Sequence, residues 1–164
     1  MYHLAIQLFA SALLIVLTTV VHGFGVVGIA NVLRLDSLEP RRKRLSVKSI
    51  GILIAVALLL FALHFLEIAL FAAFYMATGA LRGLEDSLFF SATAYSTLAQ
   101  PTEGFPVEWR LVGAIEGLVG FLLIGWSTAF FVTDMNRLLC YAYRIFLLGL
   151  TASFGAFIVQ YLSA

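Results

Sequence analysis

The 164-residue chain has few charged residues, one cysteine and three prolines. Lys, Arg, Asp and Glu make up 12% of the residues, whereas soluble domains carry roughly 25%. The single Cys140 excludes a disulfide within the chain, so the sequence does not indicate an oxidising compartment. No stretch rich in Pro, Gly or Ser marks a linker between domains. Apolar residues make up 62% of the chain, which predicts a membrane protein built as one domain.

The motifs of common enzyme classes are also missing. The chain has no CxxC, no HExxH, no glycine-rich phosphate loop and no nucleophile elbow. It lacks the inverted repeats or paired broken helices of a secondary transporter, and nothing suggests nucleic-acid binding. His64 and Glu67 supply two groups that a metal site needs, but the distant Cys140 cannot complete it. We therefore expect no enzyme, no cofactor and no metal site.

Four apolar stretches approach or exceed the ~20 residues that cross a bilayer. They cover about residues 4–33, 47–77, 111–132 and 141–162. The first stretch has no basic segment before it and is too long for a signal peptide, so we interpret it as a retained span. We expect an all-α membrane protein with four transmembrane helices. Its three parts are a peripheral span with a basic loop (1–46), a central module (47–138) and a second peripheral span (139–164).

Basic residues predict the orientation. Six of the ten Lys and Arg lie in the first connection: Arg34, Arg41, Arg42, Lys43, Arg44 and Lys48. The positive-inside rule makes this connection cytoplasmic and places both termini outside. The last connection, with Arg137 and Arg144, is then also cytoplasmic. We interpret the basic run 41–44 mainly as a topology signal. It can also contact anionic lipid headgroups, which attract each basic residue by about 1 kcal/mol.

A short amphipathic segment, residues 84–100, lies between the second and third apolar stretches. It is too short and too polar to cross a bilayer. Non-helical backbone at membrane depth is tolerated only where it is buried in protein or lines a water-filled cavity. A span, a re-entrant helix and a second span form the architecture of a pore loop. An ion channel is therefore the leading hypothesis.

Several short elements between His64 and Phe130 carry a resemblance to a known family. They are His64-x-x-Glu67-Ile68, Leu84-Glu85-Asp86-Ser87-Leu88-Phe89-Phe90-Ser91, Ser96-Thr97-Leu98, Glu108-Trp109-Arg110-Leu111, Glu116-Gly117 and Gly125-Trp126-Ser127-Thr128-Ala129. In this order they resemble the two-span pore module of small prokaryotic potassium-channel-like proteins. The resemblance implies an outer helix at 47–77, a pore-lining helix at 111–132 and four subunits around one axis. It also implies permeant cations as partners and a location in the plasma (inner) membrane of a prokaryote.

The expected selectivity filter departs from that family. Its members follow the pore helix with Thr-Val/Leu-Gly-Tyr-Gly-Asp, whose carbonyl oxygens replace the hydration shell of potassium. This chain reads Thr97-Leu98-Ala99-Gln100-Pro101-Thr102. Residues with a Cβ disfavour the positive φ that glycine allows, and Pro101 lacks an N–H. We expect Thr97, Leu98, Ala99 and Gln100 to line the axis as a rewritten filter with weak monovalent selectivity.

Three ionisable residues inside the apolar stretches are candidates for function, because such groups are costly to keep in lipid. They are His64, Glu67 and Glu116. We favour a role in bracing the pore helix by hydrogen bonds, and ion binding or proton sensing stays open as the alternative. We interpret His3 and His22 as interfacial and packing residues.

Two further groups of residues complete the predicted site. Glu103 and Glu108 fall near the outer mouth, where negative charge concentrates cations. Gly117, Gly120 and Gly125 form either a gate hinge or a close-packing surface, and small residues at this spacing more often serve packing.

Two function classes remain open. The first is a tetrameric cation channel, favoured by the acidic mouth and the retained pore helix. The second is a non-conducting regulatory or structural membrane subunit, favoured by the loss of the filter glycines.

Overall fold

The computed structural model describes the backbone of residues 2–33, 47–98 and 105–162, and their side chains except at 2, 48–49 and 137–162. All regular elements in these residues are helical. They are α1 (Tyr2–Val32), α2 (Val47–Ala77), α3 (Leu84–Tyr95), the short 3-10 helix η2 (Val107–Trp109) and α4 (Arg110–Leu162). Three helical stretches are long and apolar enough to cross a membrane: His3–Val32, Ile50–Ala77 and Val107–Asn136. The prediction of a helical, multi-pass membrane protein is confirmed at this level.

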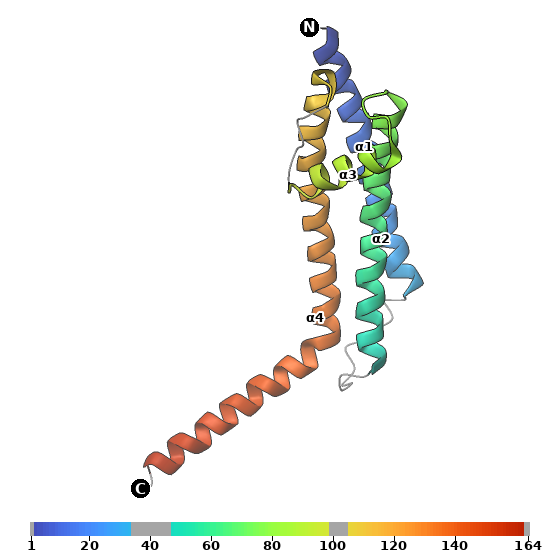
Figure 1. The fold of residues 1–164 in the computed structure, drawn as a ribbon. Coiled ribbons are helices and arrows are strands. Elements are labelled where there is room, and N and C mark those ends of the chain that lie inside the picture. The colour runs from blue at the N-terminus through green and yellow to red at the C-terminus, as the bar shows by residue number, and fades with distance from the viewer. Residues whose placement is uncertain (1, 34–46, 99–104, 163–164) are drawn as a thin grey trace.

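The prediction that a connection separates the third span from a fourth span is wrong. The predicted break between residues 132 and 141 is absent, because α4 is one helix of 53 residues. Residues 133–140 contain neither glycine nor proline, so nothing in this stretch interrupts the helical hydrogen bonds. A fourth span is not confirmed. Figure 1 shows α4 bending in its orange part, after which it diverges from the other helices.

The first part of α4 runs beside α1 and α2, and α3 lies obliquely between α2 and α4 (Figure 1). The start of α1, the end of α2 and the start of α4 share one end of the bundle. Two contacts fix this alignment. The Leu111 N–H donates to the Gln7 side-chain oxygen at 3.1 Å, and the Trp109 ring meets the Phe74 ring edge-on at 5.1 Å between centroids.

The apolar core has two parts. One surrounds Tyr75 near the end of α2, where the rings of Phe90 and Phe105 pack edge-on against its ring at 5.2 and 5.4 Å. The other lies further along α1 and α2 and includes Val26, Val56, Leu60 and Leu63. Many large apolar side chains on the outside of α1, α2 and α4 are exposed in the single chain, as expected where lipid or another chain covers them.

Candidate functional site

Residues at both ends of the short helix α3 stabilise it. Glu85 and Asp86 occupy its first turn, where negative charge interacts favourably with the helix dipole. At the other end, the Thr97 N–H donates to the Ala94 carbonyl at 3.0 Å and the Leu98 N–H to the Thr93 carbonyl at 3.1 Å. This pair of bonds is the Schellman motif, which ends helices with a residue in the left-handed region.

Thr97 is the residue in that left-handed position. Its φ is +58°, and it is the only non-glycine residue with a positive φ in the part of the chain that the structure describes. Glycine usually occupies this position because a Cβ in the left-handed region costs roughly 1–2 kcal/mol. A β-branched threonine here is therefore strained, and it stands at the first predicted filter residue.

Glu67 of α2 is the centre of a buried polar cluster. Its carboxylate lies 2.8 Å from His22 Nδ1 and 3.1 Å from His64 Nδ1, and it accepts a hydrogen bond from the Tyr95 hydroxyl. The side chains of Glu67 and His22 are fully buried, and His64 is 16% exposed. The Tyr95 phenol is the donor in its bond to this carboxylate. The cluster ties the last residue of α3 to α2.

The same cluster contacts α1, α2, α3 and α4. His22 belongs to α1, and its Nε2 lies 3.4 Å from the Ser127 hydroxyl of α4. The Trp126 ring packs at 5.2 Å from the His22 ring. With Nδ1 carrying the proton that Glu67 accepts, Nε2 of His22 accepts from Ser127, so the network has a consistent set of donors and acceptors.

Glu116 of α4 holds α3 from the opposite side. The Tyr75 hydroxyl of α2 donates to Glu116 Oε2 at 2.7 Å, and Ser91 of α3 hydrogen-bonds to Oε1. The Ser91 Oγ also lies 2.8 Å from the carbonyl oxygen of Ile68. Because a hydroxyl has one proton, Ser91 serves both partners only if Glu116 is protonated and donates to it.

Glycines of α4 allow it to approach the carboxyl end of α3. A Cβ at Gly113 would lie 3.2 Å from the Phe90 ring, and one at Gly117 would lie 3.0 Å from the Ala94 carbonyl oxygen. A Cβ at Gly120 would overlap the carbonyl oxygen of Tyr95. Gly125 differs, since nothing described lies within 4 Å of its Cβ position. Two of the three candidate hinge glycines therefore sit at a tight helix contact.

The remaining predicted residues are placed only in part. Thr97 and Leu98 follow α3 and are exposed, Leu98 to 80%. Glu108 is exposed on η2. Predicted filter and mouth residues Ala99, Gln100 and Glu103, and the basic run 41–44, lie outside the described residues.

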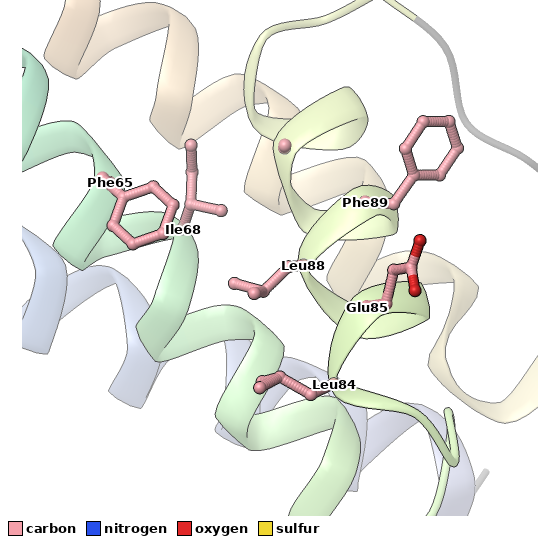
Figure 2. A pocket seen from close by; sticks show the side chains of 7 residues that line it. Phe65, Ile68, Leu84, Glu85, Leu88 and Phe89 are labelled. Carbon is pink, nitrogen blue, oxygen red and sulfur yellow. The ribbon is translucent and has the colours of Figure 1, made fainter.

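A pocket of about 470 Å³ lies between α2 and α3. Figure 2 shows Leu84 and Leu88 of α3 pointing toward α2, where Phe65 and Ile68 complete the wall. Glu85 is its only charged lining residue. Because the walls offer little polar chemistry, we place the candidate site at the two buried carboxylates and the end of α3.

The sequence reasoning missed several partners of these carboxylates. His22 is a cluster member and not merely a packing residue. The sequence did show that His22 is an ionisable residue within an apolar span, which is a signal for function. Nothing in the sequence indicated which face of α1 meets Glu67. The same holds for Tyr75, Tyr95 and Ser127, which contact groups 41, 28 and 105 residues away along the chain.

Comparisons of the chain with protein families, with curated proteins and with solved structures found no match. The function must therefore be argued from the residues and their geometry.

Proposed function

We propose that the chain is one subunit of a tetrameric cation channel, in which α2, α3 and the first part of α4 form the pore module. The observation that carries this proposal is the attachment of α3 by two buried carboxylates, one from each neighbouring helix. Such an attachment supports a position of the end of α3 between two spans, away from the ends of the bundle.

The depth of α3 follows from helix geometry. Glu67, which binds the Tyr95 hydroxyl, lies ten residues before the end of α2 at Ala77. At 1.5 Å per residue this is about 15 Å along the helix. The hydrocarbon core of a bilayer is about 30 Å thick, so Tyr95 is expected near its middle.

The chain then returns to the end from which it entered. Phe105 packs on Tyr75 and Trp109 on Phe74, both close to the end of α2. A helix that enters and a chain that leaves on one side support a re-entrant arrangement, which is tolerated where the backbone is enclosed by protein or water.

The end of α3 is suited to cations. The carboxyl end of a helix carries a partial negative charge, and the exposed Thr97 and Leu98 follow it directly. In four copies around an axis, their carbonyl oxygens would face permeant ions. Because the chain lacks the filter glycines, few carbonyl layers are expected, and selectivity between potassium and sodium should be weak.

The rest of the chain has supporting roles in this proposal. α1 lies at the periphery with the N-terminus facing outward, α4 runs from the outer side toward the cytoplasmic side, and the basic run 41–44 contacts lipid headgroups on the cytoplasmic side. A homotetramer is favoured because each chain carries one pore module and homo-oligomers close symmetrically.

Ion flux through the purified protein in liposomes tests the proposal. We expect potassium and sodium flux in preparations that contain a complex of four 18.0 kDa chains. The Gly120→Leu variant, which cannot keep the contact with Tyr95, should lose flux. Gly51→Leu, on α2 and with nothing described within 4 Å of its Cβ position, is its control. An intact wild-type tetramer without flux would instead support the non-conducting subunit.

A further inference from the structure

The cluster around Glu67 contains a set of metal-binding groups, of which the channel proposal uses only Glu67. His22, His64 and Glu67 each offer a ligand atom, and these atoms all lie within 4.8 Å of one another. Two imidazoles and a carboxylate are the protein ligands of many zinc sites. Two of the three side chains are fully buried, so the set is enclosed by protein and not spread over a surface.

The distances in the cluster are close to those of a metal centre. Both imidazoles direct Nδ1 at the same carboxylate, at 2.8 Å for His22 and 3.1 Å for His64. Bonds of 2.0–2.2 Å in tetrahedral geometry would place neighbouring ligand atoms about 3.4 Å apart. His22 contacts Oε1 and His64 contacts Oε2 of this carboxylate, and the nitrogen–oxygen distances need to open by about 0.6 Å and about 0.3 Å, respectively. The two imidazole rings are tilted by 34° and do not stack face to face.

The surroundings supply a supporting hydrogen bond for a metal ligand. If His22 binds a metal through Nδ1, its proton moves to Nε2, which lies 3.4 Å from Ser127 Oγ. A ligating histidine that donates its other N–H to a neighbouring group is the usual arrangement at metal sites.

We propose that His22, His64 and Glu67 bind a divalent transition-metal ion of the zinc class, which ties α1 to α2. Imidazole ligands favour Zn²⁺, Cu²⁺ and Ni²⁺ over Mg²⁺ and Ca²⁺. The carboxylate supplies one negative charge that compensates part of the charge of the ion. The site does not depend on the chain being a channel, since α1 and α2 alone provide its three ligands.

Cobalt binding to the full-length protein in detergent tests the site. After treatment with a chelator, the wild type should bind Co²⁺ with the visible absorption of a tetrahedral centre. Zn²⁺ should displace the cobalt and Mg²⁺ should not. His22→Gln and His64→Gln should abolish the absorption. His3→Gln, at an exposed histidine on the same helix as His22, is the matched control and should bind as the wild type does.

A further variant separates loss of the metal site from loss of the fold. Ser127→Ala retains all three ligands and should weaken cobalt binding by about 10–100-fold, as expected for the loss of a supporting hydrogen bond. Zn²⁺ should also raise the melting temperature of the wild type and of His3→Gln. The proposal would be overturned if the wild type did not bind cobalt. It would also be overturned if His22→Gln and His64→Gln both bound cobalt with the affinity of the wild type.

Discussion

The phenol of Tyr95, the last residue of α3, donates a hydrogen bond to the buried carboxylate of Glu67, about two thirds of the way along α2. One turn earlier on α3, Ser91 meets Glu116 of α4. The two carboxylates thus hold the same short helix from opposite sides. Their hydrogen-bond partners differ in kind, and this difference leads to separate predictions for the two residues.

Glu67→Gln should destabilise the metal-free protein. The carboxylate accepts from His22, His64 and Tyr95, whereas an amide has one oxygen and would turn an NH₂ group toward a donor. Hydrogen bonds to charged groups contribute about 1.5–3 kcal/mol, so the melting temperature in detergent should fall clearly. A variant as stable as the wild type would indicate that Glu67 is already protonated.

Glu116→Gln should be nearly neutral. An amide can donate to Ser91 and accept from Tyr75, as a protonated carboxyl does. Glu116→Leu removes the partner that Tyr75 and Ser91 share. Ser91 keeps the Ile68 carbonyl, so the buried Tyr75 hydroxyl is left unpaired, which should cost about 1–3 kcal/mol. The comparison is made by thermal unfolding of both variants. Equal losses in the two variants would contradict a protonated Glu116.

Gly120→Ala should destabilise the protein by about 1–3 kcal/mol, because the added methyl overlaps the backbone of Tyr95. Gly125→Ala is the control. Its methyl meets nothing described within 4 Å, and alanine is about 1 kcal/mol more favourable than glycine in a helix. Thermal unfolding checks both. Unchanged stability in Gly120→Ala, together with altered channel opening, would favour the gate hinge over packing.

Thr97→Gly should stabilise the protein by about 1 kcal/mol, because glycine adopts the left-handed conformation without the Cβ penalty. Thr93→Gly, inside α3, should instead cost about 0.3–0.5 kcal/mol through lower helix propensity. The two variants are compared by thermal unfolding. A loss of stability in Thr97→Gly would mean that the threonine side chain makes contacts that outweigh its strain.

The sequence predicted the parts of this fold that depend on local patterns. The length of the apolar stretches located the spans in α1, α2 and the first part of α4. The amphipathic segment between the second and third stretches located α3. The continuous α4 was missed because the polar residues between the third and fourth apolar stretches were interpreted as a connection, although neither glycine nor proline accompanies them. Charge predicts topology, whereas glycine and proline end helices.

The sequence predicted only those site residues that are ionisable and lie in apolar helices, because such groups are costly to bury in lipid. Glu67 and Glu116 are conspicuous in apolar helices, so their burial against protein could be expected. The role of His22 depends on how α1 rotates against α2. Both helices are apolar nearly all round, so the sequence pattern does not indicate which face turns inward.

Reversal potentials in planar bilayers test the central claim most directly. With potassium on one side and sodium on the other, we expect a cation current that reverses close to zero, because few carbonyl layers replace the hydration shell. A gradient of potassium chloride should show little chloride permeability, since the carboxyl end of α3 favours cations. Strong preference for potassium would contradict the rewritten filter, and an anion current or no current would contradict the cation channel itself.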